Sequence, residues 1–178
     1  MMRVTDAANF FIYASNQIDE DFITNLKLNK LLYYAQGCHL SRTGNPLFSS
    51  EIEAWQYGPV VPEIYQKYKV CGKDAIHTVD DDFDPEALDD QELETLLDVM
   101  RTYGKYTGSA LVSMTHKERT PWSDTINSGC SVISNDKIEQ YFKMNPINHL
   151  TINSELVDTL PKDWYDSSED AEWEDYLN

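Results

Sequence analysis

The stretch that decides the fold is residues 26–72, which read LKLNKLLYYAQGCHLSRTGNPLFSSEIEAWQYGPVVPEIYQKYKVCG. Apolar residues recur at helical spacing over residues 28–38, which predicts an amphipathic helix that packs one face into the core. Thr24 or Asn25 can cap the start of this helix, because short polar side chains accept hydrogen bonds from its first free amides. Gly44 is expected to end it, since glycine adopts the left-handed backbone of a helix end without strain.

A short β element follows this helix. Side chains alternate between two faces over residues 51–57, as they do in a β-strand, so we expect a strand or half of a hairpin there. Gly58-Pro59 should end the strand, because proline has no amide hydrogen to donate to a neighbouring strand. Pro62 suits the first turn of a further helix that ends near Gly72.

The helical period predicts four more helices in the rest of the chain. Their starts are placed at Thr5-Asp6, at Asp84 or Asp89, at Thr107 or Ser109, and at Asn135. Exposed loops are expected at residues 73–84 and 124–132. The predicted fold is therefore a single, mainly α domain over residues 1–145 with a strand or hairpin near residues 47–58, followed by an acidic C-terminal extension over residues 146–178.

Charge is distributed unevenly along the chain. It carries 14 Lys and Arg against 31 Asp and Glu, a formal net charge of −17. Residues 74–98 hold eleven acidic side chains and no basic one, and residues 161–178 hold seven acidic side chains against Lys162. Such a chain should be repelled by nucleic acid and by anionic membranes. The acidic runs could imitate a nucleic-acid backbone, but composition alone favours a role in solubility.

Cysteine usage and hydropathy point to the cytoplasm. The three cysteines are odd in number and form no CxxC pair, which fits a reducing compartment better than a disulfide framework. No apolar run approaches the ~20 residues of a spanning helix, and the N-terminus lacks the apolar core of a signal peptide. We therefore expect a cytoplasmic protein that does not enter a membrane.

No motif of catalytic, metal-binding or cofactor-binding chemistry is visible. The four histidines do not form HExxH or lie at zinc-ligand spacing from a cysteine, and GxSxG and GxGxxG are absent. We therefore predict no catalytic residue, no metal and no cofactor. His116 is the best candidate for a functional histidine, because a helix C-terminus favours the imidazolium form. The alternative is that His116 and Thr115 only tie the helix end to nearby backbone.

Two lysines and three aromatic side chains are candidates for partner contacts. Lys27 and Lys30 lie near a helix N-terminus, where the dipole disfavours cations, so contact with an acidic group would explain them. Two solvated lysines are the alternative. Trp55, Tyr57 and Trp122 belong to the residue types that dominate interface energetics, and membership of the core is the alternative for each.

Four segments of the chain together resemble one family. They are KLNKLLYYAQG at residues 27–37, PLF at 46–48, EAWQYGPV at 53–60 followed by Tyr65, and Leu111, Thr115 and His116 followed by Pro121 and Trp122. With these segments the chain resembles the Panacea antitoxin domain, also called the SocA-like or phage-associated GepA-like domain, over most of residues 4–143. Two departures are modest: Cys38 stands where an aromatic residue is common, and Ile64 stands where valine is usual.

The resemblance implies a mainly helical domain with a small β element that binds and neutralises a cognate toxin. Some members hand their toxin to a protease, and many carry an additional DNA-binding domain. Here the resemblance begins within a few residues of Met1, so we expect no autonomous binding to operator DNA. Contacts to the toxin are predicted at Lys27, Lys30, Tyr33, Trp55, Tyr57, Gly58, Pro59, His116 and Trp122.

Three functions follow from these observations. The first is a non-enzymatic antitoxin that sequesters a toxin by protein binding. The second is a proteolytic adaptor, for which the acidic tail after Pro161 would form the protease-docking surface. The third is an enzyme that uses His116 with Glu118 or a tyrosine as acid and base.

Overall fold

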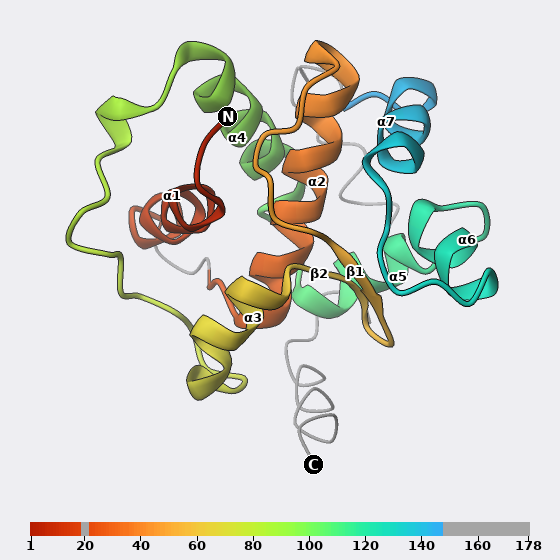
Figure 1. Cartoon of the computed structure of the whole chain (residues 1–178). Helices are drawn as coiled ribbons and strands as arrows, with labels where there is room; N and C mark the ends of the chain where they lie inside the picture. The colour runs from red at the N-terminus through yellow and green to blue at the C-terminus, as the bar shows by residue number, and fades with distance from the viewer. Residues whose placement is uncertain (19–21, 148–178) are drawn as a thin grey trace.

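The structure, a computed structural model, describes residues 1–18 and 22–147 (Figure 1). Within them lie seven α-helices, two short 3₁₀ helices and one antiparallel pair of strands. In chain order the elements are α1 Val4–Asn16, α2 Asn25–Thr43, β1 Glu53–Trp55, β2 Gly58–Val60, α3 Pro62–Tyr68, η1 Lys69–Cys71, η2 Pro85–Ala87, α4 Asp90–Tyr103, α5 Gly108–Thr115, α6 Pro121–Asn127 and α7 Asn135–Met144. The predicted mainly α class with a small β element is confirmed.

Helix α2 is the centre of the molecule. Helices α1, α3, α4, α5 and α7 and strand β2 all pack against it, and Figure 1 shows them arranged around its axis. Every residue from Asn25 to Leu40 is buried. The prediction of a helix with one buried face was therefore wrong in extent, because neighbouring elements cover the other faces as well.

The predicted caps of α2 and α4 are confirmed. The Thr24 hydroxyl accepts a hydrogen bond from the Lys27 amide at 3.2 Å, and Gly44 ends α2 with a φ of 71°. Asp84 and Asp89 were predicted as alternatives, and both act as caps. Asp84 caps η2, and Asp89 caps α4.

The predicted starts of α1 and α7 were wrong by one or two residues. Arg3 is the N-cap residue of α1, and Asp6 lies inside the first turn, where its carboxylate accepts hydrogen bonds from the Arg3 guanidinium at 2.6 and 2.9 Å. In α7, Ser134 is the cap and Asn135 is the first helical residue. An acidic group in the first turn is stabilised by the helix dipole without being the cap itself.

The β element is a hairpin, and the predicted end of pairing at Gly58-Pro59 was wrong. Both residues belong to β2. The register pairs Glu53 with Val60, Ala54 with Pro59 and Trp55 with Gly58. Proline is accepted opposite Ala54 because the Ala54 amide donates away from β2, to the Ser131 carbonyl at 2.7 Å. The pair therefore does not need a donor from Pro59.

Residues 124–132 were expected to form a loop, but the first four of them belong to α6. Thr120 starts this helix with a reciprocal cap. Its hydroxyl accepts from the Ser123 amide at 3.2 Å, and its amide donates to the Ser123 hydroxyl at 3.0 Å. The cap explains how a helix of seven residues, too short to show a clear period, can form here.

Residues 73–84 contain no helix or strand, as predicted, but they are not simply exposed. Ile76 is buried, and its amide donates to the Ile23 carbonyl at 2.8 Å. The Asp80 carboxylate forms an ion pair with Lys67 of α3. These contacts attach the acidic segment to the body of the protein.

The predicted acidic extension lies outside the described residues beyond Ile147. The proposed boundary between residues 145 and 146 therefore stays a prediction. Among the helices that are described, none is both long enough and apolar enough to cross a membrane.

A methyl group added at Gly37 tests the packing of α2 against α7. In an open helix, Gly→Ala stabilises by about 1 kcal/mol, because alanine loses less backbone entropy on folding. Here the new Cβ would overlap the ring of Phe142 in α7, and overpacking of a core costs about 1–3 kcal/mol. We expect Gly37→Ala to lower the free energy of unfolding measured by urea titration.

Gly44→Ala is the control for this experiment. No atom lies within 4 Å of a Cβ built at Gly44, so only the left-handed backbone is strained, at a cost of about 1–2 kcal/mol. A Gly37→Ala protein as stable as the wild type, or more stable, would contradict the packing described above.

Candidate functional site

Polar side chains on α2 hold the chain segments that pass beside it. Oε1 of Gln36 accepts hydrogen bonds from the amides of Leu47 at 3.0 Å and Phe48 at 3.2 Å, and its Nε2 donates to the Phe48 carbonyl at 3.1 Å. Oδ1 of Asn29 accepts from the Val61 amide at 2.9 Å. The side-chain amides of Gln36 and Asn29 therefore fix the chain segments on both sides of the hairpin.

Lys30 reaches the hairpin itself. Its side chain is 0% exposed, and its Nζ donates to the Pro59 carbonyl at 3.0 Å. Burial lowers the pKa of Lys30 to about 7, because the ammonium group loses its hydration inside the protein. Lys27 is also buried, at 4% exposed, so the alternative of two solvated lysines is wrong.

The hairpin turn contacts α5 as well as α2. Gly58 has a φ of 97°, a conformation that L side chains rarely adopt. A Cβ at this position would lie 2.7 Å from Oγ1 of Thr115 and 2.8 Å from Cε of Lys30. Glycine is therefore the residue that lets the turn sit between the two helices.

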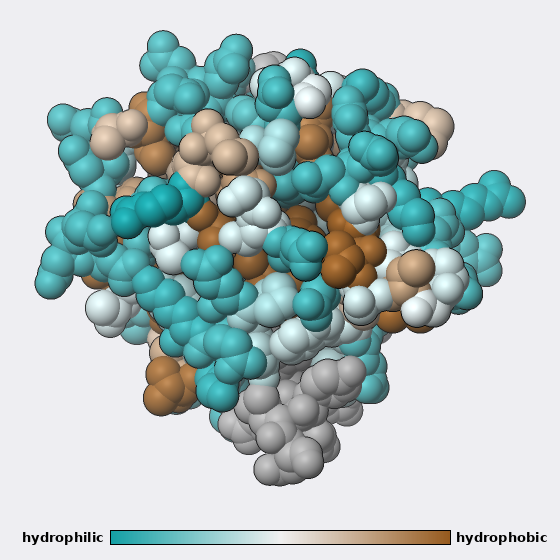
Figure 2. All heavy atoms as spheres, viewed as in Figure 1, coloured by the Kyte–Doolittle hydropathy of each residue, from teal (hydrophilic) through white to brown (hydrophobic). Residues whose placement is uncertain are grey.

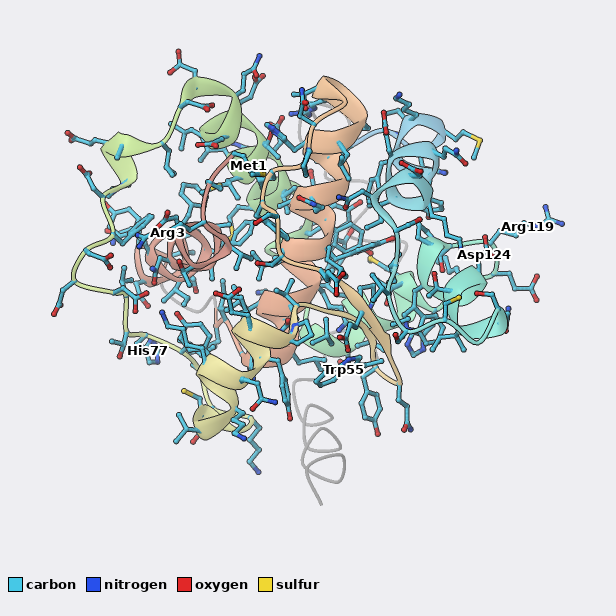
Figure 3. The ribbon with its side chains drawn as sticks, viewed as in Figure 1. Met1, Arg3, Trp55, His77, Arg119 and Asp124 are labelled. Carbon is cyan, nitrogen blue, oxygen red and sulfur yellow. The ribbon has the colours of Figure 1, made fainter. Side chains whose placement is uncertain are left out.

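His116 and Trp122 hold the hairpin from the other side. The imidazole of His116 stacks on the Trp122 indole, with ring centroids 3.9 Å apart and planes 9° apart. Nε1 of Trp122 donates to the Trp55 carbonyl at 2.7 Å, which ties α6 to the end of β1. Figure 3 marks Trp55 at the hairpin.

The protonation expected for His116 was wrong. Burial lowers its pKa, the positive charge of Lys30 lowers it further, and only the backbone of Gln56 acts in the opposite direction. The helix C-terminus was expected to favour the charged ring, but the loss of solvent outweighs that effect. His116 is therefore a neutral ring at neutral pH.

The contacts described so far form one unit, which we call the hairpin junction. It consists of Lys30, Trp55, Gly58, Pro59, Thr115, His116 and Trp122. Six of these seven belong to the set predicted for partner binding, and the seventh, Thr115, belongs to the fourth segment of the family resemblance. As contacts to a toxin they remain predictions.

The predicted contact residues differ in exposure. Lys27, Lys30, Tyr33, Gly58 and Pro59 are buried, whereas Trp55, Tyr57, His116 and Trp122 are half-buried. Tyr33 lies in the main core against Phe142, with ring centroids 5.6 Å apart. The ring of Trp55 meets Tyr65 edge-on at 4.8 Å, so it packs on one side while it keeps some exposure.

An open hollow of about 460 Å³ lies next to the hairpin junction, between the turn that follows α5 and the helix α6. It is lined by His116, Glu118, Arg119, Trp122, Ser123, Asp124, Ile126 and Asn127. The hollow therefore shares the His116–Trp122 stack with the junction. Figure 3 shows Arg119 and Asp124 on this side of the molecule, with Arg119 directed away from its body.

The amides on α2 were missed at the sequence level. Asn25 and Asn29 are four residues apart, and Nδ2 of Asn25 donates to the Tyr65 carbonyl at 3.1 Å. Gln36 lies among apolar residues of the same helix. Amide side chains inside an apolar run were the available signal, since a buried amide requires hydrogen-bond partners.

The described residues offer little chemistry for a metal or a nucleophile. No group of three or more His, Cys, Asp or Glu side chains in this part of the chain is placed to hold a metal ion. Cys38 is buried, and burial raises the pKa of its thiol to about 11, which disfavours the reactive thiolate. Cys38 therefore serves as core packing.

The buried amine of Lys30 should make stability depend on pH. The pKa of Lys30 is about 7 in the folded protein and about 10.4 in an unfolded chain. Between these values the unfolded state binds more protons, so stability rises with pH, by up to about 1.4 kcal/mol per pH unit. From pH 7 to 9 we expect Lys30 to contribute a gain of about 2 kcal/mol in the free energy of unfolding.

Comparison with Lys30→Met isolates this contribution, because methionine has a similar length but does not titrate. The difference in stability between wild type and variant should change by about 2 kcal/mol over this pH range. Lys73→Met, at an exposed position, is the control and should run parallel to the wild type. Parallel curves for wild type and Lys30→Met would show that Lys30 does not change protonation on folding.

Comparison with known proteins identifies the family to which the chain is similar. The family model described as Antitoxin SocA-like, Panacea domain matches residues 28–123, more than half of the 178 residues. Antitoxin SocA of Caulobacter vibrioides (strain NA1000 / CB15N) is 35% identical over 118 residues, which cover 60% of this chain and 61% of the relative. The chain thus spans about three fifths of the length of that curated relative. No solved structure matches the chain.

Proposed function

The chain belongs to the SocA-like Panacea domain family, as the resemblance predicted, and from that premise we propose that it is an antitoxin that neutralises a toxin by binding it directly. The matched curated relative carries the name antitoxin SocA. The toxin as partner and direct binding as the mode of neutralisation belong to the proposal.

The observation that carries the proposal is the hairpin junction. All seven of its residues lie within residues 28–123, the region that the family model matches. They come from α2, the hairpin, α5 and α6, and they converge on one place beside an open hollow. A rigidly held hairpin with half-buried aromatic side chains is suited to protein binding, since tryptophan and tyrosine are frequent hot-spot residues.

A binding module is favoured over an enzyme built on His116. His116 and Glu118 both line the hollow, so the predicted acid–base pair is brought to one place. However, Nε2 of His116 is buried, and within the described part of the chain it has no hydrogen-bond partner. A ring that is stacked on Trp122 and closed off at Nε2 is poorly placed to exchange protons with a substrate.

The charge of the chain supports the rest of the proposal. A net charge of −17 favours a partner with basic character and opposes binding to DNA or to an anionic membrane. The described cysteines are free, and Cys130 is exposed, which fits a cytoplasmic protein. The alternative of a proteolytic adaptor rests on the tail after Pro161, which lies outside the described residues.

Co-expression with the toxin candidate encoded beside this gene tests the proposal. We expect growth to be restored and the two proteins to co-purify as one stable complex through size-exclusion chromatography. A toxin that disappears from protease-positive cells, without forming a stable complex, would favour the adaptor instead. Neither rescue nor complex formation would contradict the antitoxin proposal.

The absence of autonomous DNA binding is a separate prediction. In a gel-shift experiment at low salt, this chain alone should not retard DNA from its own promoter, because its negative charge opposes phosphate contacts. Tight, salt-sensitive binding by the isolated chain would contradict it.

A further inference from the structure

Arg119 differs from the other arginines of the protein. Arg3, Arg42 and Arg101 each form an ion pair with an aspartate. Arg119 is exposed, and among the described residues no carboxylate pairs with it. In a chain with 31 acidic and 14 basic side chains, an arginine without an acidic partner stands out.

The backbone at Arg119 is also unusual. Its φ is 62°, and it is the one residue other than glycine with a positive φ in the described part of the chain. The turn is held there by Thr120, whose hydroxyl donates toward the Thr115 carbonyl at 2.8 Å and the Lys117 carbonyl at 2.9 Å. Left-handed backbone costs about 1–2 kcal/mol at such a residue, and glycine would avoid that cost.

Arg119 stands at the rim of the open hollow, whose wall is the stack of His116 on Trp122. Ile126, on α6, also lines the hollow and is 41% exposed. Charged side chains line the hollow around Trp122 and Ile126, and an apolar centre with a charged rim is the usual anatomy of a protein interface. Elsewhere on the face in view, Figure 2 shows hydrophobic atoms that reach the surface between α2 and α6 among hydrophilic residues.

We propose, resting on the proposed function, that this hollow is where the toxin docks and that Arg119 selects a carboxylate on the toxin. The occupant is a helix or loop of the toxin that places an apolar side chain against Ile126 and Trp122 and an Asp or Glu beside Arg119. Arginine suits this role because its planar guanidinium binds a carboxylate through two parallel hydrogen bonds.

Charge explains why such a contact would give specificity. The protein as a whole attracts basic partners, since its net charge is −17. Glu118 and Asp124 also line the hollow and attract a basic surface, whereas Arg119 repels it unless the partner offers an acid at that one point. Arg119 therefore distinguishes one correctly oriented partner from basic proteins in general.

The test measures the affinity of wild type and variants for the toxin encoded beside the gene. Arg119→Glu and Ile126→Asp should each raise Kd by about 30-fold or more, as expected for hot-spot residues. The controls are Lys73→Glu, which makes the same charge change at an exposed site, and Val70→Asp, at an 88% exposed residue of η1. Both controls should bind within about threefold of the wild type.

Arg119→Gly separates binding from folding. Glycine relieves the positive φ, so the variant should melt at a higher temperature than the wild type, yet it should bind the toxin more weakly. A purely structural Arg119 would not combine these two effects. Restoration of binding to Arg119→Glu by one Asp→Lys or Glu→Lys substitution in the toxin would identify the contact.

The possible failures are distinguishable. A wild-type chain that does not bind the toxin contradicts the proposed function itself. If the wild type binds and both hollow variants bind as well as it does, the hollow is not the docking site. If Ile126→Asp alone loses binding, the toxin docks there without a carboxylate at Arg119, and that part of the inference is overturned.

Discussion

A helix buried on all its faces is constrained by the polar side chains it carries. A buried polar group without a partner costs about 1–3 kcal/mol, so each of those on α2 must meet a donor or an acceptor. Asn25, Asn29, Lys30 and Gln36 find theirs in the backbone of residues 47–65. The only strands in this backbone are the two of the hairpin, and α2 supplies hydrogen bonds that a larger sheet would otherwise provide. These hydrogen bonds from α2 therefore determine the position of the hairpin.

The same constraint connects the core to the surface that we propose binds a toxin. Lys30 reaches the carbonyl of Pro59 from inside, and Trp122 reaches the carbonyl of Trp55 from the opposite side. The stack of His116 on Trp122 then forms both the back of the hairpin junction and the wall of the hollow. A buried amine is a costly way to hold a strand. Because Lys30 holds the hairpin from the inside, the outer aromatic side chains of the junction stay partly exposed and available to a partner.

The sequence predicted those parts of the fold that depend on local pattern. For α2 and α4, the leucines at helical spacing and the capping residues predict the same helix, and both helices are present in the structure. For Lys30 the sequence offered contact with an acidic group or exposure to solvent, and nothing local indicates the carbonyl that receives it. Pro59 was expected to end pairing, because the rule for prolines assumes that every strand position needs a donor. Helix α6 is too short for periodicity, and the shape of the hollow beside Arg119 depends on the turn that joins α5 to α6. Tertiary contacts of this kind leave no periodic signal.

Amide hydrogen exchange tests the central role of α2 most directly. The amides of Leu47, Phe48 and Val61 donate to side chains of α2, so in the wild type they should exchange only when the whole protein unfolds. In Gln36→Leu, we predict that Leu47 and Phe48 lose this protection while Val61 keeps it. If these amides exchange at the rate of an open loop in the wild type, or if Gln36→Leu leaves them unchanged, the account of α2 as the organising element is contradicted.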